Sequence, residues 1–395
     1  MKYLVVIGDG MADFAVDELG GKTPLMAARK PNIDRCAREG FCGQVVTVPP
    51  GFSPGSDVAG MSLFGYDPAE CYTGRAPIEA YGMGITMDQS DVAFRCNLVY
   101  LDMRGAKVLM GDYCADHITT EEAKGLVDDL AAAVGSEEFR FFPGVSYRHI
   151  MQWKNGKSDM VTTPPHDILE KEVIDYLPKG AGAGELIKLM SDSQIFLKEH
   201  PVNRERMSRG LLPANSIWLW GQGKKPHFRT FYEKYKVNGA VVAAVDLVKG
   251  IGALAGFSTP HVEGATGYLD TDYSAKARKA RELLDRWDIV YVHVEAPDEA
   301  SHEGSLREKI KAIESIDEKV VGYLLGHMGQ DVRLLIVTDH ATPVSMRTHY
   351  ACPVPFTVFQ KGRRLGSGGT FDEENGGRVF SGDQMITLFL KGLKL

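Results

Sequence analysis

The chain has 395 residues, of which 44% are hydrophobic and 25% are charged, which is the composition of a folded globular protein long enough for two or three domains. Its formal net charge is −7, with 45 Lys and Arg against 52 Asp and Glu, so no polybasic surface is predicted. Nucleic acid and anionic membrane are therefore not expected as partners, although a local basic pocket for a small anion remains compatible with this charge.

Targeting and redox features predict a cytoplasmic protein. The N-terminal apolar run meets Asp9 at once and is too short for the apolar region of a signal peptide. The most apolar long window, residues 239–257, is interrupted by Asp246 and Lys249, so no membrane span is expected. Six scattered cysteines without a C-x-x-C pair indicate reduced thiols.

Short apolar runs rich in β-branched and aromatic residues predict buried parallel strands, because a strand covered on both faces does not alternate. In chain order they are residues 3–7, 216–220, 240–245, 289–294 and 333–338. Helical periodicity lies between them, at residues 23–38, 274–286 and 306–324. Alternating strands and helices predict an α/β fold with a mainly parallel sheet.

The middle of the chain has a different pattern. It contains predicted helices at 119–135 and 166–200, strand-like pieces near 92–101 and 147–152, and a glycine-rich break at 180–184. We therefore expect a smaller inserted domain at about 85–210, within a core domain made of residues 1–84 and 211–395.

Two candidate site residues lie in the first sixty residues. Asp9 directly follows the first predicted strand, where a carboxylate is well placed to bind a hard cation, although a turn or capping Asp fits equally. Ser56 lies in PPGFSPGSDVAG, where glycines and prolines precede an apolar helix. A helix N-terminus favours a bound phosphate, but on this segment alone a simple N-cap is the commoner explanation.

Two further clusters follow late strands. Asp298 and His302 are four residues apart, and on a helix this spacing places both on one face, where they can chelate one metal. Asp339 and His340 end another strand, and His349 follows in a loop. The alternatives are an exposed Asp–His pair and a polar loop with unrelated histidines.

Taken together, the four clusters supply three aspartates, three histidines and one serine, enough for two divalent cations. One cation can lower the pKa of the serine hydroxyl, and the other can stabilise phosphoryl oxygens. Because a phosphoryl group in transfer spreads negative charge over its oxygens, this combination predicts a phosphoryl-transfer enzyme with Ser56 as nucleophile.

These motifs resemble a known family. GDG near the N-terminus, PGSD, PDEASH, TDH and THYACPVPF are similar to the alkaline phosphatase superfamily. LMAARKPNID, SLFGYDP, YTGRAPIEA, AFRCN, GVSYRH, KGIGALAGF and GATGYLDTD extend the likeness over nearly the whole chain, to the archaeal-type 2,3-bisphosphoglycerate-independent phosphoglycerate mutases. That family includes a bacterial branch proposed to act as homoserine kinase.

The resemblance implies an alkaline-phosphatase-like core and a role for each residue. Ser56 would be transiently phosphorylated during conversion of 3-phosphoglycerate to 2-phosphoglycerate, in glycolysis and gluconeogenesis. One cation would be bound by Asp9, Ser56, Asp339 and His340, and the other by Asp298, His302 and His349. The inserted domain would bind the glycerate part and close over the site. The expected substrate contacts are Asn97, Asp116, His117, Arg148, His149 and, from the core, Lys249.

Several alternatives stay open. A homoserine kinase-like phosphotransferase would use the same serine and cations, although no ATP-binding motif of known type is present. A phosphomonoesterase would release inorganic phosphate, and a metal-binding scaffold would not need Ser56.

The mixed Asp and His ligands favour Mn²⁺ or Zn²⁺ over Mg²⁺. The expected partner is a small phosphorylated metabolite, 2,3-bisphosphoglycerate is not expected as a cofactor, and the oligomeric state is not predicted.

Overall fold

The computed structural model describes residues 1–392, which form two compact units. The core unit combines Met1–Tyr72 with the chain from His227 onward, and the inserted unit is Thr73–Pro226. The inserted unit is wider than the expected 85–210. Its boundaries lie further out because helix α5 (Arg75–Gly82) and strand β9 (Ser216–Lys224) both pack against strand β3 (Val92–Arg104).

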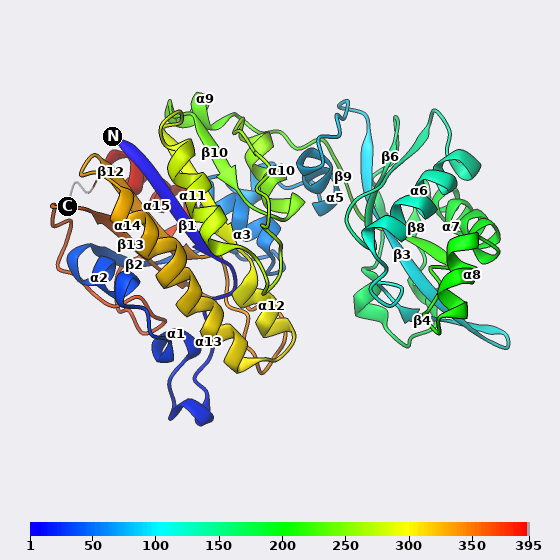
Figure 1. The fold of residues 1–395 in the computed structure, drawn as a ribbon. Helices are drawn as coiled ribbons and strands as arrows, with labels where there is room; N and C mark the ends of the chain where they lie inside the picture. Colours follow the sequence, from blue (N-terminus) through cyan, green and yellow to red (C-terminus); the bar gives the residue numbers. More distant parts are fainter. Residues whose placement is uncertain (393–395) are drawn as a thin grey trace. The chain divides into compact units, whose positions relative to one another are not determined.

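A seven-stranded sheet forms the centre of the core unit (Figure 1). Strand β13 runs antiparallel to its two neighbours, and all the other neighbouring strands are parallel. The predicted α/β class with a mainly parallel sheet is therefore confirmed. In spatial order the strands are β10 (Gly239–Val242), β11 (Ile289–Val294), β1 (Lys2–Gly8), β12 (Val332–Thr338), β13 (Val354–Gln360), β2 (Phe41–Val46) and β14 (Val379–Ser381).

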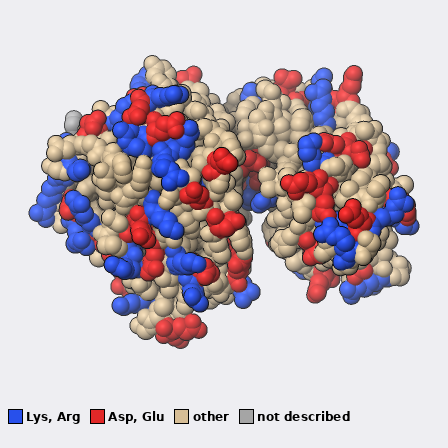
Figure 2. Space-filling view, in the orientation of Figure 1, with Lys and Arg blue, Asp and Glu red and all other residues tan. Residues whose placement is uncertain are grey.

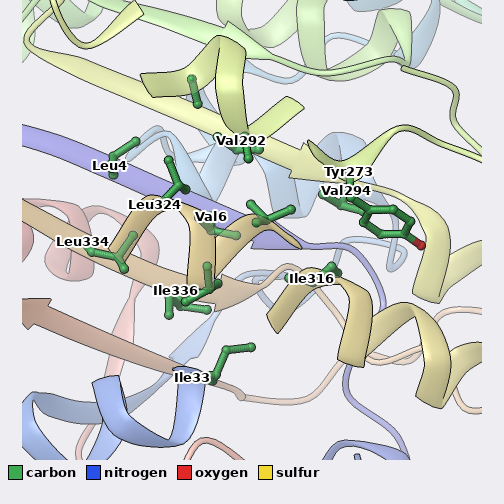
Figure 3. Close-up of a cluster of buried hydrophobic side chains, with 14 of the residues drawn as sticks. Leu4, Val6, Ile33, Tyr273, Val292, Val294, Ile316, Leu324, Leu334 and Ile336 are labelled. Carbon is green, nitrogen blue, oxygen red and sulfur yellow. The ribbon is translucent and has the colours of Figure 1, made fainter. Parts of the chain in front are cut away.

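Helices cover both faces of this sheet. Successive side chains of a strand point to opposite faces. Leu4, Val6 and Val292 belong to a buried cluster with residues of α2, α11 and α13 (Figure 3), whereas Tyr291 points to the other face and stacks on Phe64, next to α3. The helices of the core unit are α1 (Pro24–Ala27), α2 (Pro31–Glu39), α3 (Ser56–Leu63), α4 (Pro68–Cys71), α9 (Phe231–Tyr235), α10 (Asp246–Leu254), α11 (Tyr273–Leu283), α12 (Ala296–His302), α13 (Leu306–Ser315), α14 (Tyr323–His327) and α15 (Gly382–Lys391), with the 3-10 turn η1 (Asp17–Leu19) and the π-helix η4 (Ile316–Gly322).

The inserted unit contains a separate antiparallel sheet built around β3. Its other strands are β4 (Lys107–Asp112), β5 (Phe139–Phe142), β6 (Arg148–Trp153) and β9, and β7 (Met160–Val161) pairs with β8 (Lys179–Gly180). A large apolar cluster joins this sheet to α6 and α7. The helical elements are α6 (Thr120–Val134), η2 (Pro165–Ile168), η3 (Val173–Tyr176), α7 (Ala183–Lys198) and α8 (Pro201–Ser208).

Three sequence predictions need correction. The helix predicted at 166–200 forms only over Ala183–Lys198, because Pro178 and two glycines with positive φ, Gly180 and Gly182, interrupt the segment before it.

Residues 216–220 were predicted as a parallel strand of the core, which is wrong: they begin β9, which is antiparallel to β3 in the inserted unit. A run of buried apolar residues indicates a strand but does not specify its partner. The helix predicted at 23–38 is divided into α1 and α2 at Lys30, whose φ of −129° is not helical because Pro31 disfavours the α conformation before it.

The distribution of surface charge, the length and hydropathy of the helices and the state of the cysteines can be compared with what the composition predicts. Lys and Arg alternate with Asp and Glu on the face of each unit drawn in Figure 2. No helix among residues 1–392 is long and apolar enough to cross a bilayer. All six cysteines are free: Cys36, Cys42, Cys71, Cys96, Cys114 and Cys352.

The buried Asp317 supports the junction of α2 with η4, so its removal is expected to destabilise the core unit. Its carboxylate accepts hydrogen bonds from Ile33 N at 2.7 Å and Asn32 Nδ2 at 2.9 Å. Asp317→Ala leaves the buried amide of Ile33 without a partner, which costs about 1–3 kcal/mol. Urea denaturation followed by circular dichroism should show this loss in the free energy of unfolding, and an unchanged midpoint would contradict it.

Candidate metal centre and nucleophile

The candidate site lies at the carboxyl ends of three adjacent parallel strands. The register places Gly8 of β1 opposite both Val294 of β11 and Thr338 of β12, so the three strands end at the same level. Asp9 follows β1 and Asp339 follows β12 directly, and α12 begins two residues after β11. Ligands bind at this edge in open α/β sheets, so the polar residues expected there are brought together by strand register.

The first cluster consists of Asp9, Asp339 and His340. Nε2 of His340 lies 3.5 Å from Asp9 Oδ1 and 3.2 Å from Asp339 Oδ2. These two carboxylate oxygens are fully buried and make no hydrogen bond. Unpaired buried carboxylate oxygens are costly, and a cation between them would remove this cost. The donor set therefore fits a divalent metal ion.

The second cluster consists of Asp298, His302 and His349. One helical turn separates Asp298 from His302, and the distance from Oδ2 to Nε2 is 3.1 Å. His302 Nε2 also lies 3.1 Å from His349 Nε2, which is 3.6 Å from Asp298 Oδ1. Two imidazoles and one carboxylate converging at these distances again fit a divalent cation.

His340 lies between the two clusters, and its hydrogen bonds indicate its tautomer. Thr342 Oγ1 donates its proton to Asp298 Oδ1, so it accepts a hydrogen bond from His340 Nδ1, 3.1 Å away. Burial lowers the pKa of His340, which favours the neutral ring. The lone pair is then on Nε2, the atom that faces Asp9 and Asp339, as a metal ligand requires.

Ser56 is the first residue of α3, and its hydroxyl belongs to this site. Its Oγ lies 3.1 Å from His340 Nε2. The N-cap position is occupied by Gly55, and the first-turn amide of Val58 donates to the side chain of Asp57, not to that of Ser56. The simple N-cap explanation for Ser56 is therefore wrong, because the loop before α3 directs its hydroxyl towards the end of β12 instead.

The electrostatics of the site reflect three crowded carboxylates. Burial, and then the charges of Asp339 and Asp298, raise the pKa of Asp9 well above its usual value. Burial also acts to raise the pKa of Asp298, but hydrogen bonds from His302 and His349 outweigh it and hold this pKa well below the usual value. His302 is the counterpart: burial lowers its pKa, but Asp298 raises it to about 9.

Sequence reasoning missed three buried charged residues beside Asp9. His293 on β11 lies 3.3 Å from Asp9 Oδ2, and Glu295 and Lys276 continue the contacts away from the site. His293 lies within an apolar strand, and Glu295 follows that strand as the N-cap of α12, so no periodic pattern marked them as a pair. Burial lowers the pKa of His293, but Glu295 and Asp9 raise it to about 10.

The expected substrate residues of the inserted unit fall into two groups. Asp116 and His117 are exposed in a turn where residues 115–117 all have positive φ, and Arg148 is exposed at the start of β6. Asn97 is buried, and its amide bonds to Trp220 Nε1 and to the carbonyl of Tyr113. These residues stay predicted contacts.

The two remaining expected substrate residues differ in burial. His149 is buried, accepts a bond from Gly144 N at Nδ1, and has no partner at Nε2. Burial and then the charge of Arg148 lower its pKa to about 3. Lys249, in the core unit, is partly buried and lies 3.5 Å from Asp246 Oδ1. Both also stay predicted contacts.

A buried ion pair beside Asn97 was not predicted. Arg95, the second residue before Asn97 on β3, pairs with Glu79 of α5 at 2.8 Å, and its guanidinium lies over the ring of Trp220. Glu79 also pairs with Arg75 at 2.7 Å. Because Arg95 and Asn97 are two residues apart, they share one face of the sheet. The motif YTGRAPIEA contains Arg75 and Glu79 but does not show that they meet Arg95.

The chain is similar in sequence to known proteins. A family model described as 2,3-bisphosphoglycerate-independent phosphoglycerate mutase matches residues 37–203. A protein of Geobacter sulfurreducens, named as a probable enzyme of this kind, is 51% identical over 95% of both chains. One of Methanothrix thermoacetophila with this name is 49% identical over 99% of this chain and 100% of its own. The chain belongs to this family.

Two solved structures are similar to this chain over nearly its whole length. The structure of the PH0037 protein from Pyrococcus horikoshii has a TM-score of 0.84 and 32% identity, covering 99% of this chain and 96% of its own. A cofactor-independent phosphoglycerate mutase from Thermoplasma acidophilum has a TM-score of 0.65 and 25% identity, covering 99% of both chains. Because the named relatives cover 95% and 99% of this chain, family membership extends to both units.

The unpaired carboxylate oxygens predict that a divalent cation stabilises the fold. A cation that binds only the folded state adds about 2.7 kcal/mol at a free concentration of 100 times its Kd. Mn²⁺ should therefore raise the melting temperature of the wild-type chain in differential scanning fluorimetry, and EDTA should reverse the rise. Asp339→Asn should lose most of this response and Asp317→Ala should keep it. An equal response in both variants would contradict the assignment.

Proposed function

We propose that the chain interconverts 3-phosphoglycerate and 2-phosphoglycerate without 2,3-bisphosphoglycerate, through a phosphoserine at Ser56. The observation that carries the proposal is the position of Ser56 Oγ, 3.1 Å from Nε2 of His340, among buried carboxylates and imidazoles. Membership of the mutase family supports the choice of substrate. A small phosphorylated metabolite and a cytoplasmic location accord with this activity.

Seven side chains are proposed to hold two divalent cations, Mn²⁺ or Zn²⁺ in preference to Mg²⁺ because of the histidines. Bound there, the cations would supply positive charge to the serine oxygen and to the phosphoryl oxygens. One set is Asp9, Ser56, Asp339 and His340, and the other is Asp298, His302 and His349. The two unpaired oxygens, on Asp9 and Asp339, support the first set, and the contacts of His302 with Asp298 and His349 support the second.

The reaction has two half-reactions that mirror each other. In the first, Ser56 Oγ bonds to phosphorus, the bond from phosphorus to the 3-oxygen breaks, and the proton lost by the serine is balanced by the one gained by glycerate. In the second, the 2-hydroxyl of the retained glycerate attacks the phosphoserine and the serine regains a proton. Glycerate must reorient between the two steps without leaving.

Water must be excluded while Ser56 is phosphorylated, because hydrolysis would release inorganic phosphate. We assign glycerate binding and this exclusion to the inserted unit. Exposed Arg148 supports this assignment, since a guanidinium binds a carboxylate or phosphate through two hydrogen bonds. Asp116 and His117 are proposed as further contacts. A domain that closes over the substrate and reopens is a common arrangement for such a requirement.

Ser56→Ala is expected to abolish mutase activity, because the side chain that accepts the phosphoryl group is removed. Formation of 2-phosphoglycerate from 3-phosphoglycerate by the Mn²⁺-loaded chain measures the activity. Ser62→Ala, a buried serine on the same helix α3, is the matched control and should retain activity. Near wild-type turnover in Ser56→Ala would contradict the assigned nucleophile.

The same assay should distinguish the proposed acceptor from its alternatives. The wild type should form 2-phosphoglycerate with little inorganic phosphate and without ATP. Consumption of ATP that depends on homoserine, with no mutase turnover, would identify the kinase alternative. Phosphate release in place of 2-phosphoglycerate would identify a phosphomonoesterase, and either result would overturn the proposal.

A further inference from the structure

A series of four buried charged side chains leads from helix α11 to Asp9. Lys276 Nζ lies 2.7 Å from Glu295 Oε2, and His293 Nε2 lies 3.3 Å from Asp9 Oδ2. Glu295 Oε1 lies 3.1 Å from His293 Nδ1, a charge contact that does not have hydrogen-bond geometry. All four side chains are almost completely buried. Lys276 also donates to the carbonyl of His293, which fixes it to the end of β11.

Such a series is not required to hold the sheet together. Burying ions costs several kcal/mol per ion, and well-packed apolar residues often replace buried ion pairs without loss of stability. The neighbouring positions on β11 are apolar and entirely buried. The charged residues at 293 and 295 therefore point to a role at the end of the series, where Asp9 lies.

The two oxygens of Asp9 have different surroundings. Oδ2 is in contact with His293, whereas Oδ1 is buried, makes no hydrogen bond and faces His340. We infer that His293, held by Glu295 and Lys276, is a positioning residue that engages Oδ2 and thereby directs Oδ1 to the cation bound with Asp339 and His340. This inference rests on the metal site of the proposed function.

The two proposed cation sites should therefore depend differently on His293. At the first site, the ligand Asp9 is held by His293, which does not itself bind the cation. The other cation is bound by Asp298, His302 and His349, whose side chains have no recorded contact with the side chains of His293, Glu295 or Lys276; only the backbone amide of Asp298 donates to the carbonyl of Glu295. Loss of an outer partner of a metal ligand typically weakens metal affinity 10–100-fold.

The test is Mn²⁺ binding by the full chain, followed by electron paramagnetic resonance of the free ion. The wild type should bind two Mn²⁺. His293→Leu should weaken one of the two sites by about 10–100-fold and leave the other unchanged. His293→Gln, which keeps a donor towards Asp9, should recover part of the affinity, and Glu295→Gln should give a smaller loss.

Asp317→Ala is the matched control. It removes a buried carboxylate that lies on η4 and accepts hydrogen bonds from α2, and it does not change the four residues of the series. It should lower stability and bind both ions as the wild type does. Unchanged affinity in both His293→Leu and Glu295→Gln, or equal weakening of both sites, would overturn the inference, as would failure of the wild type to bind Mn²⁺. Because binding needs no substrate, two-site binding without mutase turnover would overturn only the proposed function.

Discussion

The register of β11, β1 and β12 is the constraint on which the rest of the structure depends. Because Gly8 lies level with Val294 and Thr338, the residues that follow all three strands emerge at one edge of the sheet. A shift of one residue in a strand would turn its side chains to the opposite face and separate Asp9 from Asp339. The buried apolar side chains that fix the register of these strands thus determine where the polar site forms.

Buried lysines hold the loops at this edge in place. Lys309 Nζ donates to the carbonyls of Ala12 and Thr342 and to Asp13 Oδ2, and so joins the loop after β1 to the loop after β12. Lys276 donates to the carbonyl of His293 and to Glu295 at the end of β11, and at 3.4 Å to the carbonyl of Thr266 in the loop before α11. Three carboxylates meet at this edge, where burial and then the charges of Asp339 and Asp298 raise the pKa of Asp9. The core unit therefore stabilises a site whose own charges oppose its formation.

The sequence predicted those parts of the site that depend on local spacing. Asp298 and His302 share a helix face, which their spacing predicts, and Asp339 and His340 directly follow a strand that its apolar run predicts. The contact of His293 with Asp9 depends on which strands are neighbours, and the antiparallel pairing of β9 with β3 depends on a partner more than a hundred residues away. Strand identity is a local property, whereas strand partners are set by packing of the whole unit.

The central claim is that Ser56 carries the phosphoryl group between the two oxygens of glycerate. The most direct measurement is rapid quenching of the Mn²⁺-loaded chain with 3-phosphoglycerate labelled in its phosphate, followed by peptide mapping. The account predicts label on Ser56 that appears and disappears as fast as 2-phosphoglycerate forms. Turnover with no label on Ser56, or with label on another residue, would contradict it.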